Sequence, residues 1–299
     1  MENVDLGALA LKEANVDEKA LANQAAQEIQ LATPGQPLTS SKAFMRGHGT
    51  FIQQATVVSS LAGVVERINK LVTVRALKAR YAGEIGDVVV GRITGLGTKR
   101  WHVDLNARQD GNLLLSAINL PGGVQRRKSE SDELRMRTFF TEGDLLVAEI
   151  QSLFHDGSIS LHTRNLKYGK LRNGTLVRIP PALVQRSRSH FHTIPCGVDV
   201  ILGLNGYIWV SKHIPPEVVE ANPEEVYSNR NDPDITDEER TNVARVVNCI
   251  IALSRQFIHI HETAIVYAFE ASLTYPLKDI TTDRVASEIG LEVRSKLQA

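Results

Sequence analysis

The chain has 299 residues, of which 42% are hydrophobic and 23% are charged. This composition is typical of a folded globular protein and excludes wholesale disorder. No stretch approaches the roughly 20 apolar residues that a membrane-spanning helix needs, and the N-terminus lacks a basic-then-apolar export signal, so we expect an intracellular protein without a membrane partner. Cys196 and Cys249 form no C-x-x-C pair, so we expect no disulfide framework, no zinc site and no cofactor.

Charge is balanced overall but segregated along the chain. The 34 basic and 34 acidic residues cancel, which alone argues against a nucleic-acid-binding protein. Residues 157–198 nevertheless contain no acid, whereas residues 217–239 are strongly acidic. The basic residues of the acid-free run are Arg164, Lys167, Lys170, Arg172, Arg178, Arg186 and Arg188. Such segregation favours a basic face that can bind a phosphate backbone, although solvated loops would give the same pattern.

The first third of the chain predicts a tail followed by a small β domain. Residues 1–35 are rich in Ala, Gln and Asn and end at a Thr-Pro-Gly break, which indicates a flexible tail. Residues 36–83 contain β-branched runs at 55–58, 63–68 and 71–76, which predict a small antiparallel β unit. It is too small for a core of its own, so we expect it to pack on another domain or chain.

Residues 84–166 predict a five-stranded OB-type barrel. The expected strands lie at 88–94, 100–106, 113–115, 145–153 and 158–162, and the last two form a hairpin across Asp156-Gly157. Five short strands with one long loop, here the basic and polar residues 121–140, give the rhythm of this barrel.

Residues 167–299 predict an α+β domain. Strand-like pieces at 175–179 and 198–210 precede an acidic linker at 217–239. Thr236 begins a capping box with Glu239, so a helix should start there, followed by helices at 262–273 and after Thr282. The fold class is therefore mixed α+β and multidomain.

Several motifs resemble known RNA-binding families. GDVVVG at 86–91, DGNLL at 110–114, FTEGDL at 140–145 and ISL at 159–161 are similar to the successive signatures of a ribosomal-protein S1-type domain. KRWHVD at 99–104 and GLNGYIW at 203–209 resemble two motifs of the cap subunits of the eukaryotic RNA exosome. The order of a small N-terminal β domain, an S1 domain and a KH-type domain with G-x-N-G also resembles that family, from about residue 33 to the C-terminus.

This resemblance implies a function. Such a cap subunit would sit with the other two cap proteins on a ring of RNase PH-like subunits, gripped by its N-terminal domain, and its S1 domain would line the entrance of a central channel for single-stranded RNA. The ring and caps would be inert, and associated 3′-to-5′ exoribonucleases with helicase cofactors would degrade and process RNA, including ribosomal RNA. The family implies nuclear, nucleolar and cytoplasmic localisation.

Basic residues on or near the barrel loops are the candidate RNA contacts, because loops at one mouth of an OB barrel hold oligonucleotides. They are Lys99, Arg100, Arg126, Arg127, Lys128, Arg135, Arg137 and Arg164. Contacts to phosphate that ignore base identity suit a channel through which every RNA passes. The long loop also contains the acids Glu130, Asp132 and Glu133, so both signs of charge occur there.

Three ring side chains are further candidates. Trp101 alternates with Val103 and Leu105, which favours a core position, and base stacking is the alternative. His102 points to the opposite side of its strand, and His155 lies beside the hairpin turn, so both are candidates for RNA contact.

The motif Gly203-Leu204-Asn205-Gly206 invites comparison with the G-x-x-G clamp of KH domains. That clamp joins two helices, whereas here a strand with Trp209 follows, so the glycines are expected to serve a tight turn and close packing. The resemblance implies a structural role for Gly203, Asn205, Gly206 and Trp209, and an RNA clamp is the alternative.

No catalytic motif of the common kinds is present. His259-Ile260-His261-Glu262 lacks H-E-x-x-H spacing, and no Walker, G-x-S-x-G or dinucleotide fingerprint occurs. We therefore expect a non-enzyme. The alternative is a free-standing S1/KH RNA-binding regulator, and a nuclease would require clustered acids with Mg²⁺.

Overall fold

The computed structural model describes residues 30–77, 80–119, 129–165, 167–213 and 235–298. The chain divides into two compact units, with the boundary between Ala79 and Arg80, whereas the sequence predicted a boundary at 83/84. Within the described residues no helix is both long and apolar enough to cross a membrane.

The first unit contains two small sheets. One has the order β1-β6-β7-β3 and the other β2-β5-β4. The strands are β1 (Leu31–Ala32), β2 (Pro37–Ser40), β3 (Met45–Arg46), β4 (Thr50–Gln53), β5 (Thr56–Ser59), β6 (Gly63–Ile68) and β7 (Leu71–Ala76). The expected runs at 63–68 and 71–76 are the strands β6 and β7, which pair antiparallel around Asn69, whose φ is 55°.

Two details of this unit differ from the expectation. Leu31 and Ala32, which the sequence assigned to the tail, pair with β6, and β3 pairs with β7 in parallel rather than antiparallel. Residues 1–29 of the predicted tail lie outside the described residues. The buried apolar side chains of this unit are few and small, namely Ala32, Val57, Val58, Val72 and Val74.

The second unit begins with a barrel of five strands. They are β8 (Val88–Gly97), β9 (Arg100–Asp104), β10 (Gly111–Ile118), β11 (Leu145–Leu153) and β12 (Ile159–Thr163). Neighbours pair antiparallel in the order β10-β9-β8-β11-β12, and a parallel pairing of β12 with β10 closes the ring. β13 (Gly169–Lys170) extends the sheet beside β11. The OB-type barrel predicted from the sequence is confirmed.

The sequence predicted one long loop at residues 121–140, and this prediction is wrong for the second half of that range. Residues 129–140 are not an open polar loop, because they form α2 (Glu130–Leu134) and α3 (Met136–Phe139). Met136, Phe139 and Phe140 are buried in the barrel core. Burial of these apolar side chains holds the segment against the barrel. The sequence did not indicate this contact, because charged residues surround the apolar ones.

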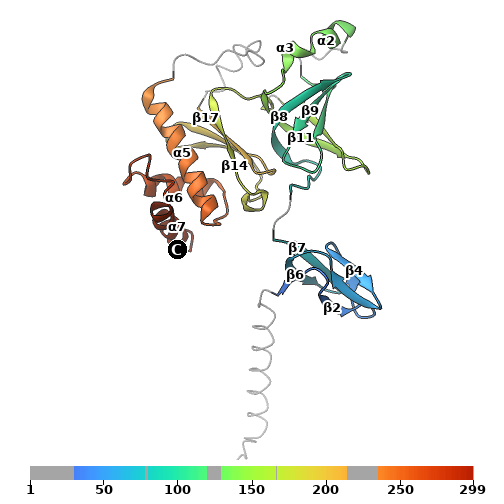
Figure 1. Cartoon of the computed structure of the whole chain (residues 1–299). Helices are drawn as coiled ribbons and strands as arrows, with labels where there is room; N and C mark the ends of the chain where they lie inside the picture. Colours follow the sequence, from blue (N-terminus) through green and yellow to red (C-terminus); the bar gives the residue numbers. More distant parts are fainter. Residues whose placement is uncertain (1–29, 78–79, 120–128, 166, 214–234, 299) are drawn as a thin grey trace, which may run out of the picture. The chain divides into compact units, whose positions relative to one another are not determined.

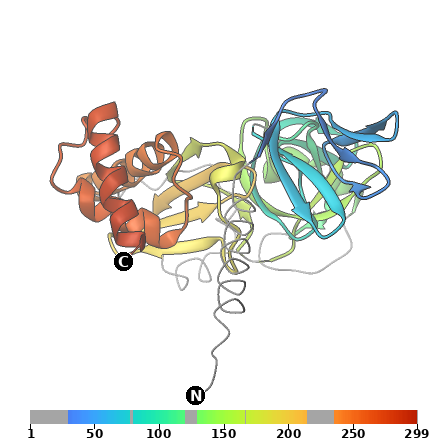
Figure 2. The same cartoon turned by 90° about the horizontal axis from the view of Figure 1, so that it is seen from below.

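An α+β module completes the second unit. Its sheet has the order β14-β17-β16-β15, and three helices cover one face of it (Figures 1 and 2). Its elements are β14 (Gly174–Arg178), η2 (Pro181–Leu183), β15 (Phe191–Ile194), β16 (Val198–Leu202), β17 (Tyr207–Lys212), α5 (Asp237–Arg255), α6 (Glu262–Ser272) and α7 (Asp283–Gln298). The capping box of Thr236 and Glu239 is present at the start of α5.

The expected strand at 198–210 is two strands. β16 and β17 form a hairpin whose turn, residues 203–206, carries the G-x-N-G motif. Gly206 has φ +82°, and a Cβ atom there would lie 2.3 Å from the carbonyl oxygen of Ile179. The motif therefore joins two strands rather than two helices.

Asn205 fastens this turn to the barrel. Its side chain is fully buried, and its Nδ2 donates to the carbonyl oxygens of Val90 (2.7 Å) and Leu105 (3.0 Å). Its Oδ1 accepts a hydrogen bond of 3.4 Å from the Val90 amide. One side chain thus satisfies three buried backbone groups on β8 and beyond β9. Such groups are costly to leave unpaired.

Further contacts complete this joint between barrel and module. The Leu204 amide donates to the Val88 carbonyl at 3.0 Å, and the Tyr207 hydroxyl donates to Asp104 at 3.0 Å. Val90, Tyr207 and Trp209 form a buried apolar cluster. The barrel strands and the module therefore share one packed interface, with Trp209 inside it.

We expect Trp101→Ala to destabilise the barrel by about 3–5 kcal/mol, because the ring fills its core. Trp101 has no exposed surface, its Nε1 donates to the Phe140 carbonyl at 3.2 Å, and the two rings meet edge to face at 5.5 Å. Urea unfolding followed by circular dichroism measures the effect. Phe257→Ala is the control, since that ring is 78% exposed and its removal should cost less than about 0.5 kcal/mol. Equal effects would contradict a core role.

We expect Asn205→Ala to cost about 1–3 kcal/mol for each buried backbone group that it leaves without a partner. Asn205→Asp should cost more, because a carboxylate cannot donate to the two carbonyls and adds a buried charge. Urea unfolding and amide exchange at Val90 report the effect. Asn165→Ala, at an exposed position, is the control, and an Asn205→Asp protein as stable as this control would refute the role assigned to Asn205.

Candidate nucleic-acid interface

The two ends of the barrel differ in what occupies them. The turn between β8 and β9, the start of β11 and the ends of β10 and β12 lie at one end, because neighbouring strands alternate in direction. The turn between β11 and β12 lies at the other end, where Asn205 of the module also donates to the carbonyl oxygen of Leu105, just after β9. The contacts of the module are not confined to that end, because the buried cluster of Val90, Tyr207 and Trp209 also packs against Leu145 at the start of β11.

Most of the predicted cations that the structure describes gather at the first end, here called the basic end. Lys99 occupies the β8–β9 turn, Arg100 starts β9, and Arg164 follows β12. Arg135 and Arg137 belong to the α2–α3 segment, which packs on this end through Met136 and its neighbours. All five of these side chains are exposed.

A hollow of about 310 Å³ lies at the basic end between the β8–β9 turn and the short helices. Lys99 and Arg137 line it together with Glu133 and Met136. The sequence missed this hollow, because it arises from the folding of α2 and α3 onto the barrel.

The charge of the basic end is mixed. Lys99 Nζ lies 3.4 Å from Glu133 Oε2, and Arg137 Nη2 lies 3.2 Å from Glu142 Oε1. The two cations are 65% and 72% exposed, and exposed pairs of this kind contribute only about 0–1 kcal/mol. A phosphate group can therefore compete with these carboxylates for the cations.

Two predicted ring contacts are placed differently. Trp101 lies inside the barrel, so the core alternative is the observed one, and its assignment as an RNA contact is wrong because RNA cannot reach it. His155 is exposed in the β11–β12 turn, at the end opposite Lys99. The sequence alone did not distinguish the β8–β9 turn from the β11–β12 turn. The directions of the strands place the two turns at opposite ends of the barrel.

His102 alternates with Trp101 along β9 and is partly buried on the outer side of the strand. Arg126, Arg127 and Lys128 lie outside the described residues, as does most of the acidic linker. The barrel wall therefore adds one partly exposed ring to the candidate interface, and the basic loop residues remain a prediction.

Two cations of the acid-free run pair with acids of the barrel instead of forming a basic face. Arg186 Nη2 lies 2.7 Å from Asp87 Oδ1, and its Nη1 lies 2.9 Å from Glu84 Oε2. Lys170 Nζ pairs with Asp144 at 2.6 Å. The sequence could not show this, because the acids that receive these cations belong to the barrel.

Asp87 is the buried centre of this polar cluster. Its side chain is 3% exposed, and its Oδ2 accepts hydrogen bonds from the Tyr81 hydroxyl (2.6 Å) and the Glu84 amide (3.0 Å). Burial, and then the hydrogen bond to Asp87, raise the pKa of the Tyr81 phenol. Tyr81 therefore stays protonated and keeps donating to the carboxylate.

Family models match three consecutive stretches of the chain. Residues 31–68 match the N-terminal region of "Exosome complex exonuclease RRP4", residues 80–152 match "RRP4, S1 domain", and residues 174–216 match a KH domain. The matched stretches cover β1 to β6 of the first unit, the barrel from its start to β11, and the strands of the module.

Curated relatives match almost the whole chain. "Exosome complex component RRP4" of Bos taurus is 49% identical over 89% of this chain and 90% of its own length. The protein of this name from Schizosaccharomyces pombe is 48% identical over 88% and 82%, and that of Saccharomyces cerevisiae is 43% identical over 91% and 85%. With this identity over nearly the full length, and with all three regions in order, the chain belongs to the RRP4 family of exosome complex components.

Proposed function

We propose that this protein is a non-catalytic, RNA-binding cap subunit of the RNA exosome. In this proposal it stabilises the ring of RNase PH-like subunits, together with the other two cap proteins, and guides single-stranded RNA into the central channel. Associated 3′-to-5′ exoribonucleases, served by helicase cofactors, then degrade or process the RNA, including ribosomal RNA, in nucleus, nucleolus and cytoplasm. The observation that carries the proposal is the basic end of the barrel, where five exposed cations gather.

The chemistry of the basic end suits passage rather than sequence readout. Lys and Arg on turns and short helices contact phosphates, which every RNA presents alike. Exposed cations form contacts that break easily, so a strand held there can still slide. The hollow beside Lys99 and Arg137 provides a concave, polar surface next to these cations.

A single purification separates this proposal from a free-standing RNA-binding regulator. Gentle native isolation of the tagged chain, followed by native mass measurement, should yield a multi-subunit particle that contains RNase PH-like chains. A monomer that binds a selected RNA sequence tightly would reject the cap function and favour the regulator.

We expect the triple variant Lys99→Glu, Arg100→Glu and Arg137→Glu to weaken RNA retention by the assembled particle. For single strands the slope of log binding constant against log salt should fall by about 0.7 for each phosphate that the protein no longer neutralises. Retention of an unstructured oligonucleotide, titrated with salt, measures both quantities, and recovery of intact particles shows that assembly is unaffected.

Arg108→Glu is the matched control for that experiment. Arg108 is equally exposed but lies between β9 and β10, at the other end of the barrel. We expect it to leave the affinity and the salt slope unchanged. Equal weakening by the control and by the triple variant would remove the basic end as the RNA path.

A further inference from the structure

An exposed segment with alternating arginine and serine lies beside the joint. Residues 186–189 read Arg-Ser-Arg-Ser, and all four are exposed and outside regular secondary structure. The segment is held at both ends, because Val184 bridges to Ile260 before it and β15 follows it. It is therefore a tethered loop on the surface of the module.

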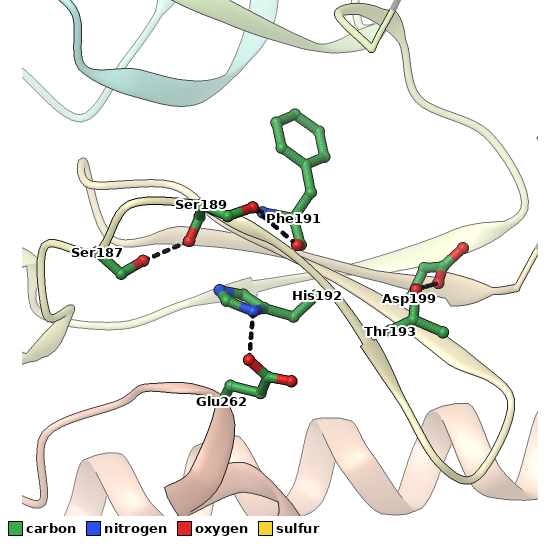
Figure 3. Close-up of polar contacts among 7 residues, drawn as sticks. All are labelled: Ser187, Ser189, Phe191, His192, Thr193, Asp199 and Glu262. Atoms are coloured by element: carbon green, nitrogen blue, oxygen red, sulfur yellow. Dashed lines mark hydrogen bonds and ion pairs between the residues drawn. The ribbon is translucent and has the colours of Figure 1, made fainter.

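The two serine hydroxyls form their hydrogen bonds within this loop and with Phe191 at the start of β15. Ser187 Oγ donates to the carbonyl oxygen of Ser189, and Ser189 Oγ donates to that of Phe191 at 3.1 Å (Figure 3). Figure 3 also shows His192 of β15 pointing toward Glu262 at the start of α6. His192 Nδ1 lies 2.8 Å from Glu262 Oε2, and this contact links β15 to α6. Among the described residues, both hydroxyls therefore bond only to backbone groups two residues further along the chain.

Arg186 connects this loop to the barrel. Its guanidinium bridges Glu84 and the buried Asp87, yet its side chain is 57% exposed. A negative group on the adjacent Ser187 would therefore lie close to the exposed guanidinium of Arg186, which already links the module to the barrel.

We propose that Ser187 and Ser189 are phosphorylation sites for a protein kinase that recognises arginine beside serine. In this step the serine Oγ forms a bond to the γ-phosphorus of ATP, and the bond from that phosphorus to the β–γ bridging oxygen breaks. ADP leaves, and the hydroxyl proton passes to a base of the kinase. The proposal does not depend on RNA binding or on assembly into an exosome.

Phosphorylation would act on the joint through Arg186. A phosphoserine carries a charge of about −1.5 to −2 at neutral pH and three strong acceptor oxygens. It competes with Glu84 and Asp87 for the guanidinium, and any departure of Arg186 leaves the carboxylate of Asp87 buried without its cation. The joint between barrel and module then loosens.

The first test uses the full chain, Mg-ATP and an arginine-directed serine kinase, with mass spectrometry of the product. We expect phosphate on Ser187 and Ser189. Ser295 is the internal control, because it is exposed between Arg294 and Lys296 but lies within α7, where a kinase cannot bind it as an extended strand. Absence of phosphate at Ser187 and Ser189, or equal phosphate at Ser295, overturns the proposal.

The second test asks whether the phosphate acts on the joint. Amide exchange at Leu204, which donates to the Val88 carbonyl at 3.0 Å, should become several-fold faster in the phosphorylated chain. Arg186→Gln should give the same acceleration without phosphate, and phosphorylation should add little to it. Ser187→Ala with Ser189→Ala should leave exchange unchanged. If the phosphorylated chain exchanges like the unmodified one, the coupling through Arg186 is wrong.

Discussion

The arrangement of the second unit depends on one buried amide. Asn205 reaches out of the β16–β17 turn and satisfies the backbone of Val90 on both its amide and its carbonyl, together with the carbonyl of Leu105. An amide is suited to this role because it both donates and accepts, whereas a carboxylate or an alkyl group cannot. Close approach of the turn requires Gly203, since a Cβ atom there would lie 2.4 Å from the Tyr207 carbonyl and 3.1 Å from the Val90 amide. These contacts hold the β16–β17 turn against β8 and against the residue that follows β9.

The net charge is zero, but the cations of the chain include two kinds, those paired with carboxylates of the barrel and those exposed at the basic end. Lys170 and Arg186 belong to a stretch of sequence without any acid, yet each meets a carboxylate of the barrel in the folded chain. Segregation of charge along a sequence can therefore reflect pairing between two domains as well as an electrostatic face for a ligand. In this protein the pairing is observed for Lys170 and Arg186, and exposure and partner geometry distinguish these cations from the exposed ones of the basic end.

Much of the architecture could be predicted, because local patterns are strong where one face of an element is buried. Alternation around Trp101 favoured a core tryptophan, and the capping box of Thr236 and Glu239 marked the start of α5. The α2–α3 segment could not be predicted, since Met136 and Phe139 are too few to reveal helical periodicity among charges. β15 was missed for a similar reason, because it is a four-residue edge strand that contains a histidine. The candidate site was predicted by residue type but not by location, as His155 shows, because strand direction in the closed barrel decides which turns share an end.

Tyr81 attaches the start of the second unit to the barrel. Its ring is 7% exposed in the barrel core, its backbone bridges to Ala107, and its hydroxyl is fixed on Asp87. The segment that begins the second unit is therefore anchored to the barrel by a buried ring, a backbone bridge and a side-chain hydrogen bond. Because Asp87 immediately precedes β8 and also holds Arg186, one carboxylate contacts both the anchor of the first residues of this unit and a cation of the module.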